Sequence, residues 1–203
     1  AVDIFDNDGR ALPAGAGSGE LVCTKPFPCM PIGFWNDEDG SKFKKAYFED
    51  YQNVWCHGDW VERTAQNGFI IHGRSDATLN PGGVRIGTAE IYRQVEKISS
   101  VLESVAVGQD WEGDVRIILF VILRENISLD EELIDHIKKQ IRSGASPRHV
   151  PAKIIQVRDI PRTKSGKITE LTIRDILHGR PIKNKEALAN PEALDIYADL
   201  KIA

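Results

Sequence analysis

Basic side chains and a glycine gather in residues 161–167, which read Pro-Arg-Thr-Lys-Ser-Gly-Lys. The glycine predicts a tight turn, and the apolar pattern after it predicts a helix at residues 168–178 that ends at Gly179. A lysine ammonium is a compact charge on a long stem, so Lys167 at this turn could be delivered to phosphoryl oxygens. The spacing is not that of a Walker A loop. A solvated basic turn is the alternative for Lys167 taken alone.

A second set of candidate residues lies upstream. Asp59 follows Gly58 after an apolar and aromatic stretch. A carboxylate at a strand end can accept both hydroxyls of a ribose, because each oxygen has two lone pairs. Arg74 closes the predicted strand 68–73, where a guanidinium could bind ribose or phosphate oxygens at two points. Asp76 is short, polar and tolerant of unusual backbone angles, which makes it a candidate hinge residue. Turn residues and a surface ion pair are the alternatives.

A third set lies in residues 80–90, which read Asn-Pro-Gly-Gly-Val-Arg-Ile-Gly-Thr-Ala-Glu. Gly82 and Gly83 would let a ligand or another backbone approach closely. Arg85 alternates with apolar neighbours, as on a hairpin strand, and Thr88 is expected to cap the next helix, with a glutamate in its first turn. A plain hairpin before a capped helix explains the glycines and the threonine, but it gives no reason for Arg85.

Two kinds of scaffold must position these residues. Short strands and loops are predicted up to residue 75, with strands at 20–23 and 68–73. Beyond that point helical and strand patterns mix, which indicates an α+β fold with a short sheet covered by helices. Helices are predicted at 88–99 and 168–178, and a third runs from a capping box at Ser128 and Glu131 to about residue 142. Strands are predicted at 101–107, 115–123 and 152–157. We therefore expect a β-rich subdomain at 1–75, an α+β domain at 76–180, and a tail with a late helix at 181–203.

The composition is that of an ordinary globular protein, with 41% hydrophobic and 28% charged residues among 203 and a net charge of -4. This mild acidity argues against a dedicated nucleic-acid binder, and no apolar run is long enough to cross a bilayer. The three cysteines and five histidines lack metal-ligand spacing, so no metal site is expected in this chain. Unpaired cysteines favour a reducing, cytoplasmic setting.

The order of the motifs resembles the C-terminal part of the adenylate-forming enzymes, a superfamily that includes acyl-CoA synthetases, peptide-synthetase adenylation domains and luciferases. The motifs are Gly58-Asp59 and residues 73–76, 83–90 and 161–167, so the resemblance covers nearly the whole chain. Within the superfamily, residues 174–192 look like acetoacetate–CoA ligases. Ala77 departs from the pattern, because many relatives have a second acidic residue after the hinge.

The resemblance implies how the candidate residues would handle ATP. Asp59 would hold the ribose hydroxyls, with Arg74 assisting at the ribose. Arg85 would meet the nucleotide or its phosphates in one orientation of the small domain. Lys167 would be catalytic, since its charge would stabilise the transition state in which the acyl-adenylate forms.

The resemblance also implies a moving domain and a larger enzyme. Asp76 would be the hinge about which a small lid domain swings, and Gly82 and Gly83 would line the path of the CoA thiol. The acyl pocket and the ligands of Mg²⁺ would lie upstream of this sequence, so this chain alone is expected to be inactive. The implied activity is an ATP-dependent acetoacetate–CoA ligase, with small-molecule substrates and neither nucleic acid nor membrane as partner. A ligase for acetate, propionate or another short acyl group, and a free-standing lid-like module without catalysis, are the alternatives.

Overall fold

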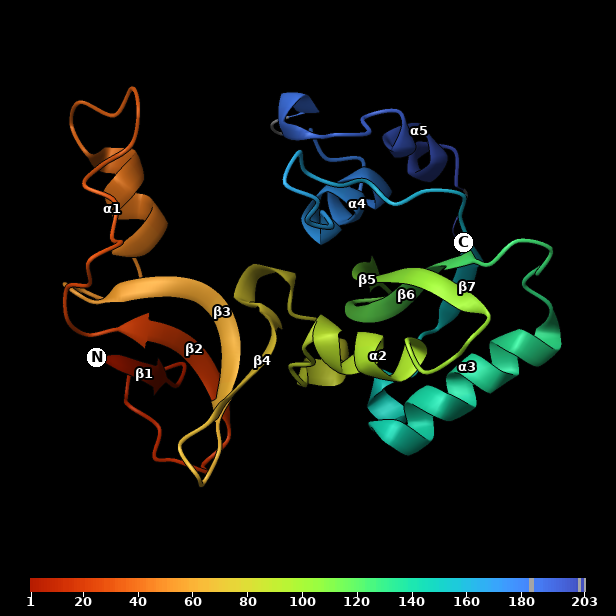
Figure 1. The fold of residues 1–203 in the computed structure, drawn as a ribbon, viewed down its shortest axis with the longest axis horizontal. Helices are drawn as coiled ribbons and strands as arrows, with labels where there is room; N and C mark the ends of the chain where they lie inside the picture. The colour runs from red at the N-terminus through yellow and green to blue at the C-terminus, as the bar shows by residue number, and fades with distance from the viewer. Residues whose placement is uncertain (183–184, 201, 203) are drawn as a thin grey trace. The chain divides into compact units, whose positions relative to one another are not determined.

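The computed structural model describes residues 1–182, 185–200 and 202. These divide into two compact units, Ala1–Asp76 and Ala77–Ala203, which we call unit 1 and unit 2 (Figure 1). Each unit has its own sheet. None of the helices in the described residues is long and apolar enough to cross a membrane.

Unit 1 is built on a four-stranded antiparallel sheet in the order β1-β2-β3-β4. Its inner side chains include Ile4, Val22 and Val61, which are fully buried. The predicted strands at 20–23 and 68–73 are present, and β3 places Asp59 in mid-strand rather than at a strand end. The strands are β1 (Val2–Phe5), β2 (Ser18–Cys23), β3 (Trp55–Arg63) and β4 (Phe69–Arg74).

Unit 1 also contains a helix, α1 (Ser41–Tyr47), which the sequence analysis missed by predicting only strands and loops there. None of its residues is buried, and a run of seven residues is too short for a helical period to stand out in a sequence. Its stabilising partner is Trp55 on β3, whose ring stacks on Tyr47 with the centroids 3.6 Å apart. Phe43 meets the same ring edge-on.

Unit 2 contains a three-stranded sheet of β5 (Val101–Trp111), β6 (Asp114–Leu123) and β7 (Lys153–Gln156). β5 and β6 pair antiparallel, and β6 and β7 pair parallel. The first two strands form one long hairpin, closed by a two-residue loop in which Glu112 and Gly113 have φ of 51° and 82°. Positive φ at both loop residues is typical of the turns that match strand twist. The strands therefore run further toward the loop than the predicted 101–107 and 115–123.

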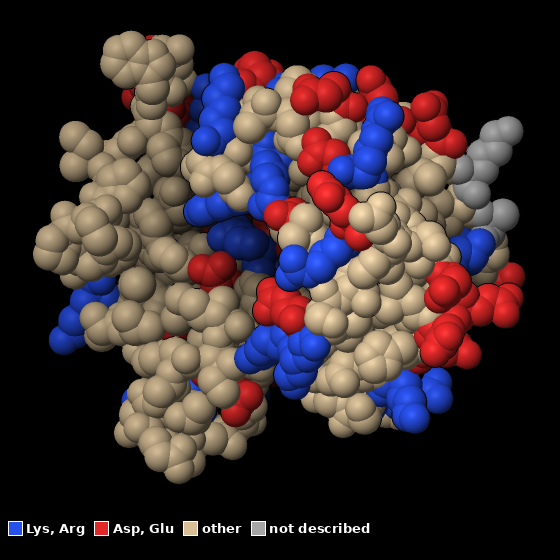
Figure 2. All heavy atoms as spheres, turned by 45° about the vertical axis from the view of Figure 1, so that its right-hand side comes forward, with Lys and Arg blue, Asp and Glu red and all other residues tan. Residues whose placement is uncertain are grey.

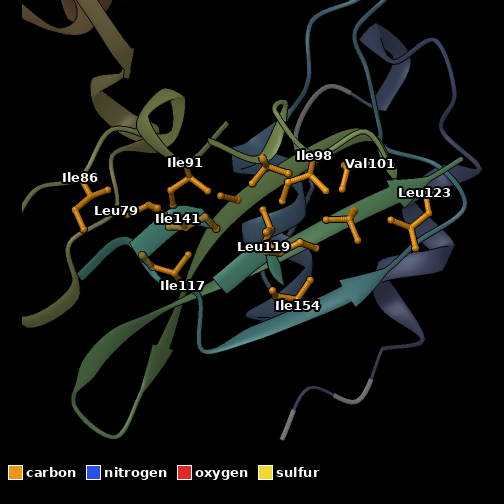
Figure 3. Close-up of a cluster of buried hydrophobic side chains, with 14 residues drawn as sticks. Leu79, Ile86, Ile91, Ile98, Val101, Ile117, Leu119, Leu123, Ile141 and Ile154 are labelled. Carbon is orange, nitrogen blue, oxygen red and sulfur yellow. The ribbon is translucent and has the colours of Figure 1, made fainter. Parts of the chain in front are cut away.

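Helices cover both faces of this sheet, which confirms the predicted α+β class. Successive strand residues point to opposite faces, so Leu119 and Ile117 contact one pair of helices while Phe120 and Ile118 contact the other. The first face packs on α2 (Thr88–Val95) and α3 (Glu131–Gly144), as Figure 3 shows. The second face packs on α4 (Glu170–Leu177) and α5 (Ala193–Ala198). In Figure 1, α4 and α5 lie above the sheet, and α2 and α3 lie below it.

Two predicted helix starts and one predicted cap were wrong. The side chain of Asp130, not Ser128, caps α3 by accepting from Leu133 N at 2.8 Å. α2 begins at Thr88, the first residue of the predicted helix, so Gly87 and not Thr88 is its N-cap. α4 begins at Glu170 because the residues before it pair with the strand-like segment at 161–163. Short 3-10 turns complete the chain: η1 (Ser75–Ala77), η2 (Pro81–Gly83), η3 (Pro147–His149) and η4 (Lys185–Ala187).

Candidate functional site

Asp59 and Arg74 are directly opposite each other on β3 and β4. Asp59 Oδ1 lies 3.7 Å from Arg74 Nη1, and that nitrogen also donates to His57 O at 3.1 Å. The Arg74 Nε lies 3.5 Å from Asp76 Oδ1, so carboxylates flank the guanidinium on two sides. The Asp59 side chain is 21% exposed and that of Arg74 52%. The pair is therefore positioned by strand pairing and remains accessible from solvent.

Gly58 makes room for this arrangement. Its φ is +80°, and a Cβ built on it would lie 2.5 Å from Arg74 Nη2. The guanidinium thus lies across the bare glycine backbone, in the space that any other residue would fill. Gly58 N donates to Glu20 Oε1 at 2.8 Å, which holds the backbone in place from β2. Both the left-handed backbone and the close contact require glycine here.

His57 is a member of the cluster that the sequence analysis did not single out, since it noted only that the histidines lack metal-ligand spacing. Trp55 Nε1 donates to His57 Nδ1 at 3.2 Å, so the neutral ring carries its proton on Nε2. That nitrogen lies 3.4 Å from Asp59 Oδ2. The available signal was spacing, because residues two apart on a strand share a face.

The donor set fits a ribose. His57 Nε2 and Arg74 Nη1 lie 3.4 and 3.7 Å from the Asp59 oxygens, beyond normal hydrogen-bond length. The Asp59 carboxylate therefore keeps acceptor capacity for two hydroxyls. No group of three His, Cys, Asp or Glu side chains in the described part of the chain could hold a metal ion.

In unit 2, Gly82 and Gly83 form the turn of a small hairpin. Leu79 and Ile86 close it with two backbone hydrogen bonds of 2.9 and 2.8 Å. The glycines have φ of 58° and 76°, and no heavy atom lies within 4 Å of a Cβ built on either one. Gly82 N donates to both oxygens of Asp114, each at 3.0 Å. The backbone conformation demands glycine, and its outer surface is bare.

Arg85 is exposed on this same hairpin. Its neighbours confirm part of the predicted alternation, because Ile86 is buried and Val84 is 37% exposed. Only Ile86 pairs across the hairpin, as an isolated bridge to Leu79. The segment is thus a short turn with one bridge rather than a regular strand.

Lys167 lies in a second turn of unit 2. Thr163 N donates to Lys167 O at 2.8 Å and Gly166 N to Thr163 O at 2.8 Å, with Gly166 at φ 84°. The hydroxyl of Thr163 also accepts from Lys167 N at 3.1 Å. The side chain of Lys167 is exposed. Within residues 1–182, 185–200 and 202, its ammonium makes no hydrogen bond or ion pair.

The glycine turn and the lysine turn are attached at opposite ends of the β5–β6 hairpin. Gly82 binds Asp114, which pairs with Trp111 at the hairpin loop. The lysine turn is attached by Arg162, whose Nη2 donates to Glu103 near the start of β5. Positions 103 and 111 are eight residues apart, or roughly 26 Å along a strand. The β5–β6 hairpin therefore holds the glycine turn and the lysine turn far from each other.

The structure brings together some of the predicted site residues and not others. Asp59, Arg74 and Asp76 form one cluster in unit 1, whereas Gly82, Gly83 and Arg85 share a hairpin in unit 2 and Lys167 lies on a separate turn. On the face shown in Figure 2, Lys and Arg side chains are interspersed with Asp and Glu, in keeping with the net charge of -4.

The chain is similar to known proteins in both sequence and structure. Residues 92–167 match the AMP-binding enzyme C-terminal domain, a match that ends at Lys167. An acetoacetyl-coenzyme A synthetase of Rhizobium meliloti (strain 1021) is 64% identical over 201 residues, which are 99% of this chain and 31% of that protein. The chain carries the C-terminal domain of the AMP-binding enzymes. An acetoacetyl-CoA synthetase of Mus musculus is 45% identical over 98% of this chain and 30% of its own length.

Solved structures of adenylate-forming enzymes share the fold. Acetoacetyl-CoA synthetase from Streptomyces lividans has a TM-score of 0.90 and 41% identity, over 98% of this chain and 30% of that one. A benzoate CoA ligase from Burkholderia xenovorans LB400 has a TM-score of 0.71 and 26% identity, over 86% of this chain and 33% of that one. The chain thus spans about a third of the length of the adenylate-forming relatives it matches and corresponds to their C-terminal portion.

Proposed function

We propose that this chain is the C-terminal portion of an ATP-dependent acetoacetate–CoA ligase. In the first step, the acetoacetate carboxylate attacks the α-phosphorus of ATP, and the bond to pyrophosphate breaks. In the second, the CoA sulfur attacks the acyl carbon of the adenylate, and the bond to AMP breaks. The 64% identity to an acetoacetyl-coenzyme A synthetase over 99% of this chain carries the proposal.

Asp59 and Arg74 are the proposed ribose contacts. The supporting geometry is a carboxylate with spare acceptor capacity beside a guanidinium held across Gly58. Mg²⁺ is proposed to accompany ATP with ligands supplied by the rest of the enzyme, because the described residues of this chain offer no cluster for it.

Lys167 is the proposed catalytic residue of the first step. A carboxylate that attacks a phosphate must overcome charge repulsion, and negative charge builds on the phosphoryl oxygens. One positioned cation offsets that charge, and loss of a comparable donor costs about 10²–10³ in rate. The exposed ammonium, on a turn whose backbone is fixed, suits this role.

The second step needs a path for the thiol in place of the ammonium. We propose that unit 2 turns about Asp76, the last residue of unit 1, so that Arg85 meets the nucleotide in one orientation and the Gly82–Gly83 turn lines the thiol path in the other. The arrangement that supports this is the attachment of the two turns at opposite ends of one hairpin. A rotation that brings one end to a site removes the other end from it.

The test uses the complete enzyme with Lys167→Ala, and Lys164→Ala as its matched control on the same turn. Lys167→Ala is expected to lower acetoacetate-dependent ATP–pyrophosphate exchange about 10²–10³-fold. Thioester formation from supplied acetoacetyl-adenylate is expected to continue at close to the normal rate. Lys164 is also exposed, so its variant should keep both activities. Unimpaired ATP–pyrophosphate exchange in Lys167→Ala would overturn the assignment of Lys167. A separate comparison of acetoacetate, acetate and propionate as substrates of the complete enzyme identifies the preferred acid.

A further inference from the structure

The segment that leads into the Lys167 turn is paired along both of its edges. On one edge, Thr163 N donates to Lys167 O at 2.8 Å and Thr169 N donates to Pro161 O at 3.1 Å. On the other edge, the backbone pairs with residues 187–190 near the end of the chain. Ala189 N donates to Arg162 O at 2.8 Å, and Lys164 N donates to Ala187 O at 3.0 Å. The segment is therefore the middle strand of a small three-stranded ribbon.

Asn190 strengthens the outer edge with its side chain. Its Oδ1 accepts from Arg162 N at 2.8 Å. Its Nδ2 donates to Asp159 Oδ2 at 2.7 Å and to Ile160 O at 3.0 Å. One amide thus holds positions 159, 160 and 162 of the chain before Lys167 and satisfies both of its polar ends.

The end of the chain is itself fixed in the core of unit 2. Tyr197 on α5 is 1% exposed, and its ring meets Phe120 of β6 edge-on at 5.0 Å. Its hydroxyl donates to Asp159 O at 3.0 Å. Ala193 and Leu194 are buried with it. The tail expected at 181–203 thus contains a helix, α5, that is a packed anchor.

We propose that residues 187–197, the C-terminal strap, position Lys167 for the adenylation step and that Asn190 is a positioning residue. The proposal rests on the proposed catalytic role of Lys167. The ammonium has no partner of its own among the described residues, so its position depends on the backbone that carries it. A misplacement of about 1 Å can cost about 10²-fold in rate. The strap fixes that backbone from the edge that the turn itself leaves unpaired.

The first experiment uses Asn190→Ala in the complete enzyme, with Glu192→Ala as the matched control from the same strap. Glu192 is exposed and should be silent. Asn190→Ala is expected to lower ATP–pyrophosphate exchange by about tenfold or more, while thioester formation from supplied adenylate is retained. Unchanged exchange, or an equal fall in both steps, overturns the proposal, because general destabilisation would lower both.

The second experiment measures hydrogen exchange of residues 159–169 in the same enzyme. Asn190→Ala should speed amide exchange in this segment, at Arg162 and Lys164 above all, while Glu192→Ala leaves it unchanged. If Asn190→Ala does not fold, Tyr197→Phe removes a single hydrogen bond to Asp159 and should give a smaller change of the same kind. Unchanged hydrogen exchange rates of residues 159–169 in the folded variant would overturn the proposal that the strap positions Lys167. If Lys167→Ala keeps normal activity, the proposed function fails, and this measurement still tests the strap separately.

Discussion

The cluster at Asp59 and the turn at Lys167 are held in opposite ways. At Asp59, side chains hold one another: Arg74 and His57 approach the carboxylate, and Trp55 orients the imidazole. At Lys167 the backbone is fixed by paired edges, and the side chain extends into solvent. The first arrangement suits a ligand of fixed shape, because little side-chain entropy remains to be lost on binding. The second suits a charge that must arrive and depart.

The glycines show the same contrast. Gly58 is crowded, since Arg74 occupies the space of a side chain, whereas no heavy atom lies within 4 Å of a Cβ built on Gly82. Glycine is thus required in unit 1 for both conformation and contact, and in the unit 2 turn for conformation alone. Substitutions can separate the two requirements.

Among the variants of the Asp59 cluster and the glycines, the largest effect is expected from Asp59→Ala in the complete enzyme. Hydrogen bonds to a charged group contribute about 1.5–3 kcal/mol, so the KM for ATP should rise about 10- to 100-fold. Asp8→Ala is the control, because Asp8 belongs to an exposed ion pair with Arg10. Steady-state kinetics with varied ATP decide the matter. A KM within twofold of normal would show that the cluster does not hold the ribose.

An intermediate effect is expected from a pair of glycine variants. Alanine at a left-handed position costs about 1–2 kcal/mol, so Gly58→Ala and Gly82→Ala should both lower the urea midpoint. Only Gly58→Ala should also raise the KM for ATP, because a Cβ there displaces Arg74. Gly82→Ala should slow the thioester step instead.

Gly33→Ala serves as the control for these glycine variants, since Gly33 has no crowding neighbour and no positive φ. Equal kinetic effects of Gly58→Ala and Gly82→Ala would contradict the contrast between the crowded and the open glycine.

The smallest effect concerns the cysteines of unit 1. Burial, with the nearby Glu20 carboxylate, raises the pKa of the Cys56 thiol from its ordinary 9.0 to about 12. A thiol reagent at pH 8 should therefore modify the exposed Cys29 quickly and Cys56 slowly. Because the folded pKa is raised, the stability from protonated Cys56 is present below pH 9 and is lost as the pH rises toward 12. Equal labelling rates would show that β3 opens readily.

Much of unit 2 was predictable because its elements follow strong apolar periods. Ile91 and Val95 indicated α2, and the run from Val115 to Leu123 indicated β6, which is buried on both faces. The starts of the helices were less predictable. The pairing of Ile168 with Arg162 overrides the helical pattern, and Asp130 competes with Ser128 as a cap.

The candidate site was predictable in residue type but not in arrangement. Arg85 and Lys167 were identified by motif order, and no periodicity could show that their turns attach to opposite ends of one hairpin. Asn190 was unremarked because its amide acts on a backbone about 30 positions earlier. Contacts of that kind depend on tertiary packing and leave no local pattern in the sequence.

The parity of β6 limits how this protein can change in length. Odd-numbered residues such as Leu119 belong to the core of α2 and α3, and even-numbered ones such as Phe120 to that of α4 and α5. A single residue inserted within the strand would send every side chain beyond it to the wrong helix pair. Insertions are therefore compatible with the connection between β6 and α3, whereas the strand itself can gain or lose residues only in twos.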